Sequence, residues 1–189
     1  MANYTAIADI SKILVNNLRN NLSEVLTSNQ SVDLKSPADM STTTVNVFLY
    51  DILESGEISR STMINSGINV KQFPPIYLNL YYMITVNING EAQFKTIEEQ
   101  RIMGAIIQYF HDYPLISSDI LDPDGINDVD ARVEFIRLTM DEKHRIWNFP
   151  NVPYKASLFY KVSPIAINSS RYVNVSRVKN VDINVDSKY

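Results

Sequence analysis

The chain has 189 residues, 45% of them hydrophobic, and a formal net charge of −4. This length and apolar content predict one domain with a hydrophobic core over residues 1–168, followed by a strand-forming arm over residues 169–189. The basic residues are neither in surplus nor clustered, so nucleic acid is not an expected partner. The absence of cysteine excludes disulfides, thiolate metal sites and a cysteine nucleophile.

The N-terminal segment lacks a basic region followed by an apolar run. No uncharged stretch approaches the roughly 20 residues that a membrane-spanning helix requires. We therefore expect no direct membrane insertion, and the lack of cysteine is consistent with assembly in a reducing cytoplasm.

The first half of the chain contains one predicted helix and two predicted strands. Apolar residues at three- and four-residue steps predict an amphipathic helix over Thr5–Leu26, and the polar segment Thr27–Met40 indicates a loop. β-branched and aromatic residues predict a strand over Thr43–Ile52. After a polar stretch from Ile58 to Phe73, a nearly continuous apolar run predicts a central strand, covered on both faces, over Ile76–Val86.

The second half begins with a turn signal at Asn89-Gly90. Helical spacing follows from Thr96 to Phe110, with Glu98 and Glu99 in the expected first turn, where the helix dipole favours negative charge. An acidic loop, Asp119–Asp130, comes after this helix.

Three more elements are predicted before residue 168. They are a strand over Val133–Met140, a short helix over Asp141–Trp147 capped by Thr139 or Asp141, and a long strand over Tyr154–Ile167. Trp147 is expected to anchor the core beneath this last strand. The order of elements predicts an α+β fold, a single small sandwich of a mainly antiparallel sheet with two main flanking helices.

The acidic loop is the strongest candidate metal site, because calcium binds oxygen ligands at alternate positions such as those from Asp122 to Asp130. However, Gly125 comes too early and Val133 occupies the position where a closing glutamate is needed. A solvated turn is therefore the preferred interpretation. His111 and His144 are far apart and lack metal-ligand spacing, so no metal site is predicted.

Other chemical candidates also favour structural roles. Neither Ser55-Gly56 nor Ser66-Gly67 has the flanking glycines of a nucleophile turn, and the five glycines form no phosphate-binding loop. The tyrosines at 77, 81 and 82 indicate core or interface packing in preference to ligand or base stacking. We therefore predict a protein that is not an enzyme, without catalytic, cofactor-binding or metal-ligating residues.

Several short motifs occur in a characteristic order. They are Tyr4-Thr5-Ala6-Ile7-Ala8, Ser36-Pro37-Ala38-Asp39, Val47-Phe48-Leu49-Tyr50, Pro74-Pro75 before Leu78–Thr85, Glu99–Gly104 continuing to His111–Pro114, Arg137–Trp147, and Tyr154–Tyr160. This order resembles the N-terminal domain of the cap, or tube-terminator, proteins of extracellular contractile injection systems of the antifeeding-prophage and virulence-cassette type. The resemblance spans roughly Tyr4 to Ile167.

The resemblance implies a phage tail-terminator-like fold and a subunit of a hexameric ring. Such a ring ends the inner tube and the contractile sheath opposite the baseplate, so the implied partners are further copies of the chain, the inner tube protein and the sheath protein. The subunit would belong to an injection particle, released or cell-associated, and needs no cofactor. A baseplate or tail-completion adaptor is the alternative, and a ligand-binding module or hydrolase using the acidic loop is a remote one.

The C-terminal arm alternates strictly between apolar and polar residues only from Val181 to Val185. A solitary strand needs a sheet with which to pair, and we therefore predict that the arm adds to a neighbouring subunit or to a sheath subunit. The predicted interface residues are Tyr172, Val173, Val175, Val181, Ile183 and Val185.

Overall fold

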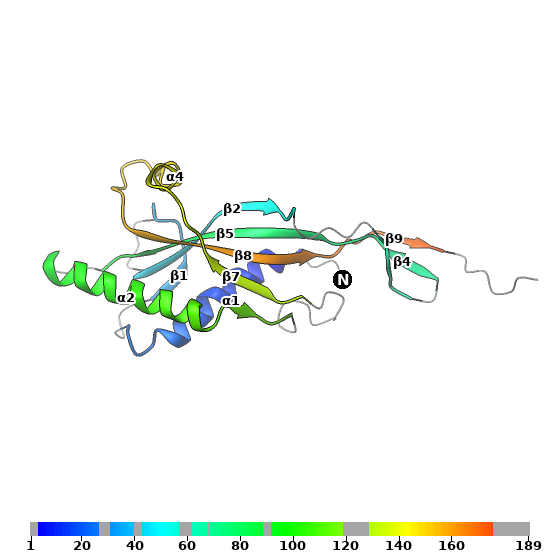
Figure 1. Cartoon of the computed structure of the whole chain (residues 1–189), viewed down its shortest axis with the longest axis horizontal. Coiled ribbons are helices and arrows are strands. Elements are labelled where there is room, and N and C mark those ends of the chain that lie inside the picture. The colour runs from blue at the N-terminus through cyan, green and yellow to red at the C-terminus, as the bar shows by residue number, and fades with distance from the viewer. Residues whose placement is uncertain are drawn as a thin grey trace, which may run out of the picture.

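The fold is α+β, as predicted (Figure 1). In the computed structural model, the described residues are 4–26, 31–39, 43–56, 62–67, 69–88, 92–118 and 129–175. The described helices are α1 (Ala6–Asn21), α2 (Ala92–Asp112) and α4 (Met140–Ile146).

The large sheet has six strands. In spatial order they are β1 (Val32–Leu34), β2 (Val45–Glu54), β5 (Ile76–Val86), β8 (Ser157–Ile167), β7 (Ala131–Phe135) and β6 (Leu115–Ile116). The pair β1–β2 is parallel and the other four pairs are antiparallel, which confirms the prediction of a mainly antiparallel sheet.

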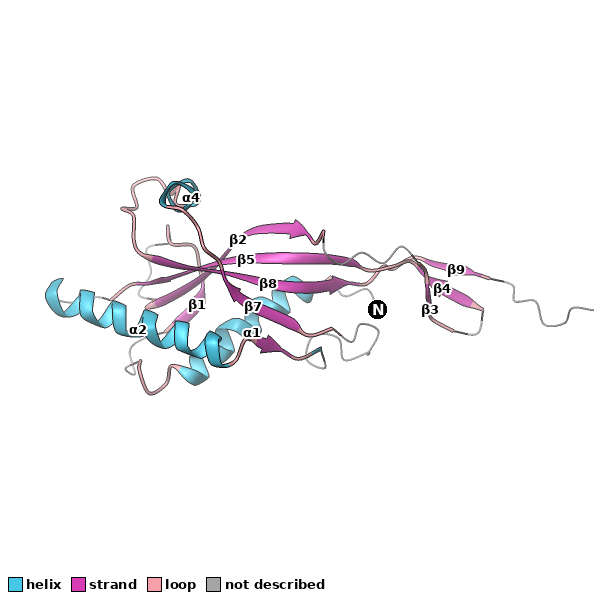
Figure 2. Cartoon of the chain, viewed as in Figure 1, coloured by secondary structure: helices cyan, strands magenta, loops and turns pink. Residues whose placement is uncertain are grey.

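A smaller sheet contains β3 (Ile64–Asn65), β4 (Val70–Gln72) and β9 (Tyr172–Asn174). Figure 2 shows that this small sheet lies beyond one end of β5 and β8, so that it projects from the large sheet. The small sheet brings together the segment before β5 and the segment after β8, because β4 precedes β5 and β9 follows β8 in the chain.

Helices α1 and α2 cover one face of the large sheet. Ile10, Leu14 and Leu18 of α1 and Ile102 and Ile106 of α2 are buried in the same cluster as alternate residues of β2, β5 and β8. These residues are four positions apart on each helix, so one stripe of each helix meets the sheet. This packing confirms the two predicted flanking helices.

The opposite face of the sheet carries a smaller cluster formed by Met83, Trp147 and Phe159. Trp147 is buried at the end of α4, and its indole Nε1–H donates to the carbonyl oxygen of Val152 at 3.3 Å. The predicted role of Trp147 as a core anchor is therefore confirmed. Because β5 contributes to both clusters, its prediction as a central strand covered on both faces is also confirmed.

Helix α1 is shorter than the predicted helix, because it ends at Asn21. The N–H groups of Val25 and Leu26 both donate to the carbonyl oxygen of Leu22, at 2.9 and 2.7 Å. The chain therefore turns while Leu22, Val25 and Leu26 stay against the core. The apolar spacing therefore predicted correctly that these residues contact the core, but it did not predict where the helix ends.

Four short strands lie in segments where no strand was predicted, and one of them is β6, between α2 and the acidic loop. β1 lies within the predicted loop Thr27–Met40, while β3 and β4 lie in the polar stretch from Ile58 to Phe73. Each has two or three residues, too few for an alternating pattern to be visible. Each of them forms because it pairs with a neighbouring strand. In β1, for example, Val32 pairs with Val45 of β2.

Helix α2 begins at Ala92, four residues before the predicted start. The assignment of Glu98 and Glu99 to its first turn was therefore wrong. A hydrogen bond from Arg101 instead lowers the pKa of Glu98. The Oε1 atom of Glu99 accepts the backbone N–H of Ile88 at 3.2 Å, so this carboxylate joins α2 to the end of β5.

The predicted strand Val133–Met140 is shorter, because β7 ends at Phe135. Of the two predicted caps, Thr139 is the residue used for α4: its Oγ1 accepts the N–H of Glu142 at 3.3 Å, and Glu142 Oε2 accepts the N–H of Thr139 at 2.7 Å. This reciprocal pair is a capping box. Strand β8 begins three residues after Tyr154, the predicted start.

Candidate assembly interface

The first part of the predicted arm pairs with its own chain. Strand β9 is antiparallel to β4, with Tyr172 opposite Gln72 and Val173 opposite Lys71. The guanidinium of Arg171 lies 4.2 Å from the centroid of the Phe73 ring and reinforces this pairing.

The predicted interface residues of β9 remain accessible despite that pairing. Tyr172 is 48% exposed and Val173 is 37% exposed. The N–H of Val175 donates to the carbonyl oxygen of Asn69 at 2.9 Å. Val181, Ile183 and Val185 lie outside the described residues, so a role of the arm between subunits stays a prediction.

The C-terminal half of β2 is a second candidate contact surface. Strand β1 pairs with β2 only as far as Val47, and no described strand pairs beyond that point on the side away from β5. Four consecutive exposed residues, Asp51, Ile52, Leu53 and Glu54, form what we call the β2 edge. The backbone N–H of Ile52 already donates to Oδ1 of Asp51 at 2.8 Å, so the two exposed aliphatic side chains are the feature that favours contact with another chain.

The opposite edge of the large sheet contains a groove between the C-terminal half of α2 and strand β7. Its volume is about 540 Å³. We call it the α2–β7 groove, and its lining residues are Ile107, Phe110, His111, Pro114, Arg132, Val133, Glu134, Phe135 and Tyr160. Ile107 and Phe135 at its rim are 43% and 54% exposed, so apolar surface faces solvent here.

Charged groups border this groove on the strand side. Glu134 lies 3.6 Å from Arg132 and 3.7 Å from Lys161, measured between nitrogen and oxygen atoms. One carboxylate is thus shared by two cations, but Lys161 does not line the groove, and the charged lining residues Arg132 and Glu134 have no net charge together. Arg132 is largely exposed and available to a further carboxylate.

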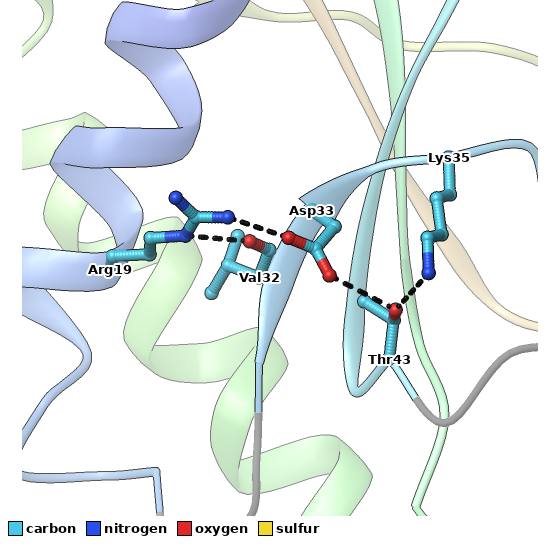
Figure 3. A network of polar contacts seen from close by, with 5 residues as sticks. All are labelled: Arg19, Val32, Asp33, Lys35 and Thr43. Atoms are coloured by element: carbon cyan, nitrogen blue, oxygen red, sulfur yellow. Dashed lines mark hydrogen bonds and ion pairs between the residues drawn. The ribbon is translucent and has the colours of Figure 1, made fainter.

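A polar network joins α1, β1 and the start of β2 (Figure 3). Arg19 donates from Nε to the carbonyl oxygen of Val32 at 2.8 Å and from Nη2 to Asp33 at 2.6 Å. The other oxygen of Asp33 accepts from Thr43, whose Oγ1 accepts in turn from Lys35 at 3.1 Å. This network joins the short strand β1 to α1 and to the segment that precedes β2.

The buried tyrosines are structural groups at neutral pH. Burial raises the pKa of Tyr82 to about 12, although a 2.8 Å hydrogen bond with Ser11 opposes this shift. Burial also raises the pKa of Tyr50 to about 12, with smaller contributions from Asp51 and Tyr81. Tyr77 and Tyr82 are buried and Tyr81 is half-buried beside Tyr50, which agrees with the predicted core or interface packing of these tyrosines.

The structure does not bring together the residues that the sequence offered as candidate metal ligands. His111 lies near the end of α2, whereas His144 lies on α4 with its ring 4.9 Å from that of Tyr154. Asp122 and Asp124 lie outside the described residues, and Asp130 accepts the N–H of Ser118 at 2.8 Å. Within the described ranges, no three potential metal ligands form a group, and no helix is long and apolar enough to cross a membrane.

The fold and these surfaces define an α+β domain with two dissimilar exposed sheet edges and a projecting small sheet. The chain belongs to the Pvc16 N-terminal domain family, whose model matches residues 9–179. The matched region begins inside α1 and extends past β9, so it includes both sheets.

Two solved structures share the fold. The sheath/tube terminator of an extracellular contractile injection system, PVC, in the extended state, is 15% identical with a TM-score of 0.65, and the match covers 97% of this chain and 64% of that one. The anti-feeding prophage cap, a tube terminating cap, is 18% identical with a TM-score of 0.61, covering 94% and 61%.

The tail-terminator-like fold predicted from the sequence is therefore confirmed. The chain spans less than two thirds of the length of either solved structure. No curated protein sequence gives a significant match to it.

Proposed function

We propose that this chain is a structural cap subunit that terminates the inner tube and the contractile sheath of a phage-tail-like injection particle. The observation that carries the proposal is the family match over residues 9–179, together with a fold shared with two tube-terminating proteins. The subunit acts by binding and performs no catalysis.

The proposed subunit assembles as a hexameric ring on the inner tube protein and the sheath protein. A tube or sheath grows by head-to-tail contacts that never close, so its end needs a subunit with one matching face and no onward face. A ring of small domains supplies such an end without a cofactor or an active site. We place its assembly in the cytoplasm, after which it becomes part of the particle.

Gene deletion tests this function directly. We expect cells lacking the gene to produce overlong, frayed or missing sheathed particles in negative-stain micrographs, because nothing stops polymerisation. Re-expression of the intact chain should restore a narrow length distribution. Particles of normal length with intact ends, in cells without a second copy of the gene, would refute termination and favour the baseplate or tail-completion role.

The C-terminal arm makes a separate contribution to the attachment of the cap protein to the sheathed particle. Truncation after Val175 keeps strand β9 and its pairing with β4, whereas truncation after Asn168 removes both. We expect the truncation after Val175 to reduce the amount of cap protein that sediments with sheathed particles, because it removes the alternating residues Val181–Val185. Undiminished cosedimentation would argue that the arm has no role between subunits.

A further inference from the structure

We propose that a small pocket at one end of the large sheet binds an amide group, the neutral group of asparagine and glutamine side chains and of the peptide bond. The pocket has a volume of about 170 Å³ and lies among the loop after β1, the start of β2, the end of β5 and the segment before β8. This is the end of the sheet opposite to the small sheet (Figure 2). We call it the Asn46 pocket, and the inference does not depend on the proposed function.

An unpaired buried side chain marks this pocket. Asn46 of β2 lines it and is 6% exposed, yet its Oδ1 atom has no hydrogen-bond partner among the described residues. A buried polar group without a partner is costly, and such groups are rare in native proteins. A ligand that donates a hydrogen bond to this oxygen would remove the cost.

The polar lining offers hydrogen-bond donors and acceptors side by side. Three of the lining residues are asparagines, Asn46, Asn87 and Asn151, and each side chain carries a carbonyl oxygen next to an NH₂ group. Lys155 donates to Oδ1 of Asn87 at 2.6 Å, so that acceptor is already used, whereas Oδ1 of Asn46 is not. An amide ligand carries the same two groups and can therefore pair reciprocally with an asparagine side chain.

The charges of the lining favour a neutral ligand. The charged lining residues Asp39 and Lys155 have no net charge together, and Lys155 also lies 3.5 Å from Glu99 outside the lining. A cation in the pocket would lie near the ammonium of Lys155, and an anion would lie near the carboxylate of Asp39. Each charge therefore meets a like charge, whereas a neutral amide meets none.

The size of the pocket suits one side chain or a short piece of backbone. A water molecule takes up about 30 Å³ of liquid volume, so a pocket of about 170 Å³ holds more than a single bridging water. Pro37, Val152 and Pro153 add apolar wall to the lining. An amide that reproduces the hydrogen bonds of the displaced waters replaces them without loss of affinity.

Titration of the isotope-labelled full chain, followed by two-dimensional NMR, tests the Asn46 pocket. The probes are acetamide and N-acetylglutaminamide, and both should give saturable shifts centred on the side-chain signals of Asn46, Asn87 and Asn151. Acetate, guanidinium and glucose at the same concentrations should leave these signals unchanged. Absence of saturable shifts with the two amides, or equal binding of any of the three other probes, would overturn the proposal.

The variant Asn46→Leu removes the unpaired amide while keeping a side chain of similar size. It should weaken the binding of both amides at least about tenfold, because two hydrogen bonds are lost. The midpoint of denaturant unfolding should not fall, since Oδ1 of Asn46 has no partner in the folded chain. A lower midpoint would mean that this group is already paired, and would reject the pocket. Asn65→Leu, at an exposed position of β3, should change neither quantity.

The same variant separates a free amide from one carried by another protein. If a partner chain in the particle supplies the amide, less Asn46→Leu protein than unaltered protein should sediment with sheathed particles. If the ligand is a free amide, the sedimented amounts should be equal although acetamide binding is lost. Particle length after gene deletion tests the cap function alone, so failure of the amide titration would reject the pocket and leave that function standing.

Discussion

Replacing Ile106 with alanine is expected to lower the free energy of unfolding by about 2–5 kcal/mol, the usual range for removing a buried aliphatic side chain. Ile106 has no exposed surface and connects α2 to the main cluster between helices and sheet. Its loss leaves a cavity that the rigid central strands cannot fill. Denaturant unfolding followed by circular dichroism should show a lower midpoint with an unchanged slope.

The neighbouring residue on the same helix provides the control. Ile107 is 43% exposed and lies at the rim of the α2–β7 groove. Ile107→Ala should change stability by no more than about 0.5 kcal/mol, as expected for a surface substitution. Equal losses of stability in the two variants would contradict the packing of α2 on the sheet.

Replacing Phe159 with alanine is expected to cost about 3–5 kcal/mol of stability, because a buried aromatic side chain is removed. Phe159 is 1% exposed and packs with Met83 and Trp147 on the face of the sheet opposite α1 and α2. Its ring also makes an edge contact with Tyr50 at a centroid distance of 5.9 Å. Trp147 is the single tryptophan of the chain, so its fluorescence reports on this cluster directly.

A second phenylalanine on the adjacent strand serves as the comparison. Phe135 of β7 is 54% exposed and touches Tyr160 edge-on at a centroid distance of 5.3 Å. Phe135→Ala should cost about 1 kcal/mol, the value of one aromatic pair. If Phe159→Ala were no more harmful and left Trp147 fluorescence unchanged, the smaller cluster would not contribute to the fold as described.

Together these four variants separate stability from assembly. The buried residues Ile106 and Phe159 act through the folded state, and their loss should reduce the amount of cap protein in the cell. Substitution of the exposed residues Ile107 and Phe135 should leave that amount nearly unchanged, so a change in particle length in these variants would come from assembly. Particle length measured for both pairs would show which effect limits termination.

The long elements and the family could be predicted from the amino-acid sequence. The stripes of α1 and α2 and the apolar run of β5 are strong signals because each element buries many residues against a partner surface. The cap of α4 was narrowed to Thr139 or Asp141 from the sequence, because a helix cap and its partners lie within one turn. The ordered motifs from Tyr4 to Ile167 indicated the tube-terminator fold, because they coincide with these same elements.

The short strands and the candidate interface could not be predicted from the sequence, because they depend on contacts between distant segments. β1, β3 and β4 exist because a neighbouring strand supplies their hydrogen bonds, and the arm begins by pairing with β4 in its own chain. The β2 edge is open because β1 stops pairing at Val47, and the α2–β7 groove joins residues from distant segments. Patterns in the local sequence predict which residues are buried. The edges of a sheet and the grooves beside it depend on which strands become neighbours after folding.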